Sequence, residues 1–134
     1  MSCCKTLSSC GFFFSKAGRC QCLKEYGGYE IWTANLKRIS ASYIGCYHDD
    51  FDRVLPHGIM QNVTDLTTET CMQHCHSINY IYFGTECTSQ CFCGHVIKPG
   101  HAKVPDKECN MPCAGDSSLL CGGYFRTSIY KINI

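Results

Sequence analysis

Fourteen of the 134 residues are cysteine, and this feature constrains the fold of the chain more than any other. So much cysteine in a short chain is typical of secreted domains, in which disulfides supplement a small hydrophobic core. We therefore expect disulfides and a secreted or extracellular location. The formal charge of +1 comes with scattered basic residues, so the composition argues against nucleic-acid binding.

The cysteines fall into two groups, five before and nine after the cysteine-free segment 23–45. Because both numbers are odd, full oxidation needs at least one bond between the groups or to another molecule. We expect a cysteine-rich segment at residues 1–40 and a domain at residues 41–134. The sequence has no apolar run long enough to span a membrane and no recognisable signal peptide, so we expect it to be part of a longer precursor.

The segment TTETCMQHCHSIN, residues 67–79, predicts a helix. Thr67 can cap its N-terminus, and Glu69 in the first turn complements the helix dipole. The i, i+4 spacing places Cys71 and Cys75 on one face of this helix.

Two segments rich in aromatic and β-branched residues predict strands, YIYFG at residues 80–84 and RTSIYKINI at residues 126–134. Alternation in the second segment places Tyr130, Ile132 and Ile134 on one side. A helix packed on short antiparallel strands is the simplest architecture, so we expect a small, disulfide-rich α+β fold.

The segment CFCG contains Cys91 and Cys93, which point to the same side if the segment is a strand. A helix and a strand that each present two thiols on one face can be joined by two parallel disulfides. The spacing suggests the bonds Cys71–Cys91 and Cys75–Cys93, although the swapped pairing remains open.

Five motifs, which run from about Tyr43 to Ile132, together resemble a WSC domain: YIGCYHDD, TTETCMQHC, FGTECTSQCFCG, ECNMPCAGDSSLLCGG and SIYKI. The resemblance implies small antiparallel sheets around one helix, similar to the PAN/apple module, without catalytic activity. WSC domains occur in fungal cell-wall stress sensors, some fungal glucan-degrading enzymes, polycystin-1-like proteins and Kremen receptors. They are regarded as modules that bind carbohydrate or contact other proteins.

The resemblance also implies four disulfides: Cys46–Cys109, Cys71–Cys91, Cys75–Cys93 and Cys113–Cys121. The second and third agree with the spacing argument. The first forty residues resemble part of a PAN/apple or second WSC-like module, with Tyr29–Trp32 as a strand. Cys87 departs from the family pattern, and we expect it to bond to a cysteine of the first group. The pairs expected from these features are Cys4–Cys20, Cys10–Cys22 and Cys3–Cys87.

Metal binding is the sharpest alternative, because three histidines lie beside thiols in CMQHCH and CFCGH: His74, His76 and His95. The family pattern uses these thiols in disulfides, so we expect no metal and no cofactor. The acidic cluster of Asp49, Asp50 and Asp52 could offer oxygen ligands to calcium. It lacks the alternating pattern of a calcium-binding loop, so we expect a solvated turn.

Glycoside hydrolysis would need paired carboxylates, and the same aspartates together with Glu86 and Asp116 could supply them. One of the pair must sit in an apolar pocket that raises its pKa, and a small module with many disulfides has little interior for such a pocket. We therefore expect no enzymatic activity.

Aromatic side chains near polar groups are the remaining functional feature, and they are typical of surfaces that bind sugars. We expect an extracellular module that binds carbohydrate, either polysaccharide or the glycans of extracellular glycoproteins. Our candidate ligand-binding residues are Tyr47, His48, Asp50, Arg53 and Tyr124. The triplet Asn62-Val63-Thr64 predicts glycosylation of Asn62.

A structural role is the alternative function. The aromatic segment at residues 12–14 and the C-terminal segment IYKINI could present strand edges. Such edges can pair with further copies of the chain or with neighbouring modules in a matrix, fibre or surface coat.

Overall fold

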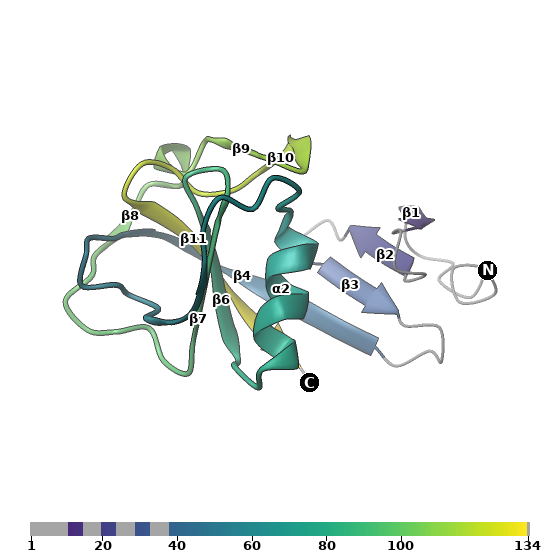
Figure 1. Ribbon diagram of the computed structural model, residues 1–134, viewed down its shortest axis with the longest axis horizontal. Helices are drawn as coiled ribbons and strands as arrows, with labels where there is room; N and C mark the ends of the chain where they lie inside the picture. The colour runs from purple at the N-terminus through teal and green to yellow at the C-terminus, as the bar shows by residue number, and fades with distance from the viewer. Residues whose placement is uncertain (1–10, 15–19, 24–28, 33–37, 134) are drawn as a thin grey trace. The chain divides into compact units, whose positions relative to one another are not determined.

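The computed structural model describes residues 11–14, 20–23, 29–32 and 38–133 (Figure 1). The chain divides into two compact units. The first comprises Met1–Ser42 with Ile132–Ile134, and the second comprises Tyr43–Lys131.

The first unit contains three short strands: β1 (Gly11–Phe14), β2 (Cys20–Leu23) and β3 (Tyr29–Trp32). They pair antiparallel in this order, and β3 pairs with the first residues of β4 (Arg38–His48). The strand expected at Tyr29–Trp32 is thereby confirmed. The expected Cys4–Cys20 and Cys10–Cys22 bonds involve Cys4 and Cys10, which lie outside the described residues.

The second unit is built on a sheet with the strand order β4-β11-β6-β7-β5. The bounds of its further strands are β5 (His57–Met60), β6 (Tyr82–Glu86), β7 (Gln90–Gly94) and β11 (Arg126–Asn133). The short elements are β8 (Lys103–Val104), which pairs with β4, the 3-10 helix η1 (Asp106–Glu108), and a separate pair, β9 (Pro112–Cys113) with β10 (Asp116–Leu120).

Helix α2 (Thr68–Ser77) packs against β6 and β7 (Figure 1). The Thr67 side chain accepts a hydrogen bond from the backbone N–H of Thr70, and the Thr70 hydroxyl oxygen accepts one from the N–H of Thr67. Glu69 lies in the first turn. The predicted helix and cap are confirmed, whereas the strand expected from residue 80 begins at Tyr82. No helix in the described part of the chain is long and apolar enough to cross a bilayer.

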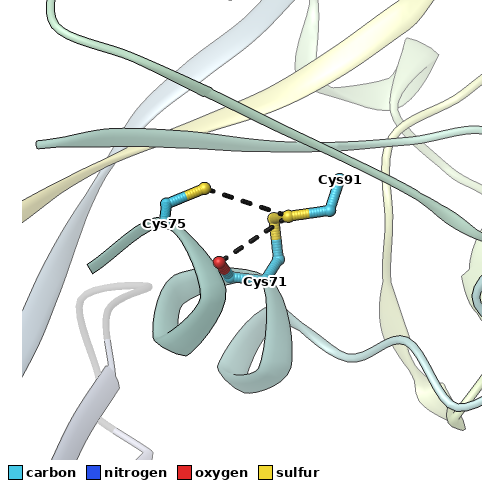
Figure 2. A group of neighbouring side chains, drawn as sticks. All are labelled: Cys71, Cys75 and Cys91. Atoms are coloured by element: carbon cyan, nitrogen blue, oxygen red, sulfur yellow. Dashed lines mark hydrogen bonds between the residues drawn. A yellow bond between two sulfur atoms is a disulfide. The ribbon is translucent and has the colours of Figure 1, made fainter. Parts of the chain in front are cut away.

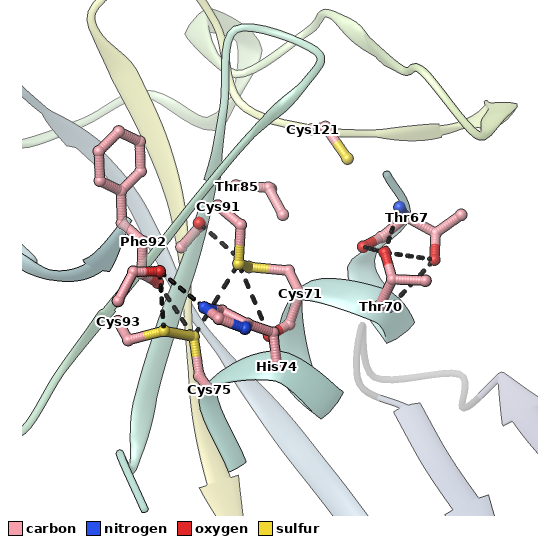
Figure 3. The surroundings of a disulfide bond; sticks show 12 residues. Thr67, Thr70, Cys71, His74, Cys75, Thr85, Cys91, Phe92, Cys93 and Cys121 are labelled. Carbon is pink, nitrogen blue, oxygen red and sulfur yellow. Dashed lines mark hydrogen bonds between the residues drawn. A yellow bond between two sulfur atoms is a disulfide. The ribbon is translucent and has the colours of Figure 1, made fainter. Parts of the chain in front are cut away.

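Two disulfides join α2 to β7, Cys71–Cys91 and Cys75–Cys93 (Figure 3). All four cysteines are buried. Figure 2 shows the Cys75 sulfur beside the Cys71–Cys91 bond, and it lies only 3.9 Å from the Cys91 sulfur. The Cys75 sulfur thus lies near Cys91 although it is bonded to Cys93. The spacing of the cysteines in the sequence does not by itself distinguish these two partners.

Two further disulfides complete the second unit. Cys46–Cys109 links residues 63 positions apart, and Cys113–Cys121 closes a local ring of separation 8. The four bonds are those that the family resemblance implied, and the expected small, disulfide-rich α+β fold is confirmed. Directly after the ring, Gly122 adopts a positive φ of 67° where a Cβ would collide with the Thr85 carbonyl oxygen.

The described residues include several fully buried hydrophobic side chains, among them Leu66, Met72 and Phe83. Val54, Leu55, Phe92 and Ile129 form one buried cluster, and burial of each such side chain contributes about 1.5–3 kcal/mol. The four disulfides add to this stabilisation by restricting the unfolded chain.

We predict that removing Cys46–Cys109 lowers the free energy of unfolding more than removing Cys113–Cys121. In the chain-entropy model the longer loop contributes about 4 kcal/mol and the shorter one about 2.5 kcal/mol. Urea unfolding of the Cys46→Ser/Cys109→Ser and Cys113→Ser/Cys121→Ser proteins measures the difference. Equal losses would contradict the prediction.

Candidate binding pocket

A tight turn between Gly123 and Arg126 carries two aromatic side chains at its tip. The backbones of Gly123 and Arg126 exchange two hydrogen bonds, of 2.8 and 3.1 Å. Tyr124 and Phe125 are the two residues between them; Phe125 has a positive φ of 50°, and Tyr124 is 76% exposed. The Phe125 carbonyl oxygen accepts a hydrogen bond from the Asp49 N–H, so this turn is joined to the end of β4.

Phe125 stands between two exposed rings. Its ring contacts Tyr124 and Phe51 edge to face, at centroid distances of 4.9 and 5.3 Å. The Arg53 guanidinium lies over the same group of rings, 5.6 Å from the Phe51 centroid and 5.0 Å from that of buried Phe92. Cation–π attraction therefore helps to hold Arg53 against this aromatic surface.

Two buried carboxyl groups face Arg53. Its Nη1 atom lies 3.2 Å from Asp49 and 3.4 Å from Glu86, whose side chains are 1% and 2% exposed. Asp49 also accepts a hydrogen bond from the Val54 N–H. Burial, then the hydrogen bond with Asp49 and its negative charge, raise the pKa of Glu86 to about 9, although Arg53 opposes the shift. Glu86 therefore carries a proton at neutral pH and donates it in a hydrogen bond to Asp49.

These groups surround a cavity of about 150 Å³, here called the aromatic pocket, lined by Phe51, Arg53, Glu86, Cys87, Gln90, Tyr124 and Phe125. A second, more open hollow is lined by Lys107, Glu108, Asn110, Met111, Arg126 and again Tyr124. Tyr124 thus stands between two concave surfaces.

The structure places two of the five candidate ligand residues, Arg53 and Tyr124, in the aromatic pocket. Tyr47 instead packs, partly buried, against the hydrophobic core. His48 and Asp50 lie in a different cluster, with His101.

The sequence interpretation missed Phe51, Phe125 and Glu86 as pocket residues. An exposed aromatic among charged residues, as in HDDFDR, was an available signal for Phe51. Glu86 gave no such signal, because its burial depends on strands that pair only in the folded chain.

We expected the acidic cluster to be a solvated turn, and this prediction is wrong for Asp49. Its side chain is buried, pairs with Arg53 and accepts a hydrogen bond from the Val54 N–H. The same prediction is right for Asp50 and Asp52, which are exposed. Asp50 accepts a hydrogen bond from the backbone of Asp52, and Asp52 pairs with Lys98 at the surface.

Glu86 is a buried carboxyl group with a raised pKa, which we did not expect from the sequence of so small a module. Glu86 and Asp49 nevertheless share a hydrogen bond, which places them closer than the separation of about 5 Å between the carboxyl groups of retaining glycosidases. Asp116 accepts hydrogen bonds from the Ser118 N–H and hydroxyl, and these lower its pKa. The arrangement does not supply an acid and a base on opposite sides of a substrate.

Cys87 has a free thiol, and Cys3, the partner expected for it, lies outside the described residues. Cys87 and Thr88 have positive φ values in the turn between β6 and β7, and the Cys87 side chain lines the aromatic pocket. The thiols on either side of His74, which the family pattern places in disulfides, form the bonds Cys71–Cys91 and Cys75–Cys93 (Figures 2 and 3).

A sequence model of the WSC domain family matches residues 43–123, more than half of the chain. The chain belongs to the WSC family. The match contains all four disulfides of the second unit and five residues of the aromatic-pocket lining, whereas Tyr124 and Phe125 follow directly after it.

Curated relatives from insects and fungi each match about two thirds of the chain. The xylosyltransferase oxt of Drosophila pseudoobscura pseudoobscura is 35% identical over 92 residues, which are 68% of this chain and 10% of that protein. A WSC domain-containing protein of Arthroderma benhamiae is 33% identical over 91 residues, 66% of this chain and 10% of that protein. A putative fungistatic metabolite of Chaetomium globosum is 30% identical over 94 residues, 69% of this chain and 42% of that protein. The matched residues therefore span less than half of each of these relatives, and only 10% of the first two.

We predict that Arg53→Met lowers the free energy of unfolding by about 3 kcal/mol, because it leaves the buried Asp49 carboxylate without its counter-ion. Lys98→Met is the matched control. It removes the cation of the pair with the fully exposed Asp52 carboxylate and should cost much less stability, because solvent screens that pair. Urea unfolding at pH 7 compares the two, and similar losses would contradict the prediction.

We also predict that the free energy of unfolding falls as pH rises from 5 to 8. Between the ordinary Glu86 pKa of 4.5 and its folded value of about 9, the folded protein retains a proton that the unfolded chain releases. Glu86→Gln does not titrate, so it should gain up to about 1.4 kcal/mol per pH unit relative to wild type. The control, Asp116→Asn, should follow wild type, because the lowered pKa of Asp116 lies below this window. Parallel stability curves for wild type and Glu86→Gln would refute this account.

Proposed function

We propose that residues 41–134 form a non-enzymatic, extracellular WSC module that binds carbohydrate through the aromatic pocket. The observation that carries this proposal is the pair of exposed rings, Phe51 and Tyr124, at the rim of a cavity that also offers polar groups. Aromatic rings can pack against the C–H faces of sugars, while polar groups at the same surface hydrogen-bond to hydroxyls.

The polar groups of the pocket favour an uncharged ligand. The positive charge of Arg53 is matched by Asp49, and Glu86 is protonated at neutral pH. Gln90 adds an amide that can both donate and accept hydrogen bonds. A neutral sugar therefore requires no further counter-charge in this pocket.

The position of Tyr124 favours a ligand longer than one sugar ring. Its ring borders both the aromatic pocket and the open hollow around Met111 and Arg126. A chain of sugars could contact both sides of Tyr124, as expected for a polysaccharide or a glycoprotein glycan.

The covalent chemistry of the chain supports secretion. Four disulfides are typical of proteins that fold in an oxidising compartment. Asn62 is exposed, as a glycosylation acceptor must be, and its modification remains a prediction.

We predict that Tyr124→Ala and Phe51→Ala each weaken glycan binding at least about tenfold, a loss of about 1.4 kcal/mol. A glycan array with the soluble protein identifies a ligand, and calorimetry with that ligand measures the affinities. Val96→Ala is the matched control, because Val96 is an exposed apolar residue outside the pocket lining and should leave the affinity unchanged.

The alternative is a module that assembles with itself or with neighbouring proteins. Two results together would favour protein contact over sugar binding. The protein would show no saturable glycan binding, and it would form oligomers with rising concentration that are absent in Tyr124→Ala. Ligand binding that is equally weakened by Val96→Ala would refute the assignment to the pocket.

A further inference from the structure

A second cluster of functional side chains lies where the end of β4 meets the segment before β8. His48, Asp50 and His101 each offer one ligand atom, and these atoms lie within 4.8 Å of one another. Donors around a tetrahedral zinc ion, bound at about 2.0–2.1 Å, are separated by about 3.3 Å. Small side-chain rotations would therefore bring the three atoms to coordinating distance.

The backbone fixes the two histidines opposite each other. Tyr47 pairs with Lys103 across β4 and β8, and the His48 N–H continues the ladder by donating to the Ala102 carbonyl oxygen at 2.9 Å. The imidazole rings of His48 and His101 are consequently stacked, with their centroids 6.3 Å apart. The nearby Cys46–Cys109 disulfide anchors this part of β4.

The His101 ring is oriented by backbone and carboxylate oxygens. Its Nδ1 atom lies 3.1 Å from the His48 carbonyl oxygen and 3.9 Å from Asp49 Oδ1, and the side chain is only 4% exposed. Because a carbonyl oxygen can only accept, Nδ1 carries the hydrogen, and Nε2 keeps a lone pair for a ligand. Metal-binding histidines usually donate their other N–H to a carbonyl or carboxylate in this manner.

The third donor, Asp50, is oriented by a hydrogen bond, and the nearby cations pair with other carboxylates. One oxygen of Asp50 accepts the hydrogen bond from the Asp52 backbone, which orients the carboxylate and leaves its second oxygen available. Lys98 pairs with Asp52, and Arg53 pairs with Asp49. Neither cation is therefore directed at Asp50.

We propose that His48, Asp50 and His101 form a site for a divalent transition-metal ion of the zinc type. Two imidazole nitrogens and one carboxylate oxygen suit zinc better than calcium, which takes six to eight oxygen ligands. Three protein ligands leave a fourth position open for water or another oxygen donor. The site is independent of the proposed sugar binding, because none of its three ligands lines the aromatic pocket.

The first test measures binding of Zn²⁺ alone to the oxidised protein by calorimetry, in a Cys87→Ser background that removes the free thiol. We expect one site, with affinity reduced at least about tenfold by His48→Ala and by Asp50→Asn. His57→Ala and His95→Ala are matched controls, since the rings of these histidines lie against Tyr80 outside the cluster, and both variants should bind zinc like the parent. Equal losses in all four variants would show adventitious binding to surface histidines and overturn the proposal.

A second measurement does not depend on substitutions that weaken the fold. In ¹⁵N-labelled Cys87→Ser protein, stoichiometric Zn²⁺ should shift the ring-nitrogen resonances of His48 and His101 and leave those of His57 and His95 in place. Addition of Ca²⁺ at the same concentration should shift none of them. Shifts confined to histidines outside the cluster, or no zinc-dependent shifts, would refute the site.

Discussion

The two disulfides between α2 and β7 are the constraint on which the rest of the second unit depends. They place the only α-helix of this unit's described residues against β6 and β7, and so bury Cys71, Met72 and Cys75 on that face. Because β7 also pairs with β6, these bonds fix the hairpin that carries Glu86 and Cys87.

The sequence predicted the helix and its disulfides because their determinants are local. Thr67 caps the first turn, and the spacings of Cys71 with Cys75 and of Cys91 with Cys93 are regular in a helix and a strand. Local determinants did not decide between the parallel and the swapped disulfide pairing. In the folded chain the Cys75 and Cys91 sulfurs lie only 3.9 Å apart without being bonded. The family resemblance, rather than the spacing, distinguished the two.

The aromatic pocket was predicted only in part, because it is assembled from three distant segments. Phe51 follows β4, Glu86 ends β6, and Tyr124 precedes β11, so only the strand order β4-β11-β6 brings them together. Composition likewise gave no sign that a proton would be shared between Glu86 and Asp49. The retained proton depends on burial of Glu86 beside Asp49, and the nearby Arg53 opposes it.

The turn that carries Tyr124 and Phe125 has a consequence for the kinetics of recognition. It contains only two residues between hydrogen-bonded neighbours, and Cys121 of a closed disulfide ring lies just before it. A ligand would meet rings whose backbone is already ordered, so little conformational entropy remains to be lost on contact. Association should then occur in a single step limited by encounter, without a slower phase of loop rearrangement.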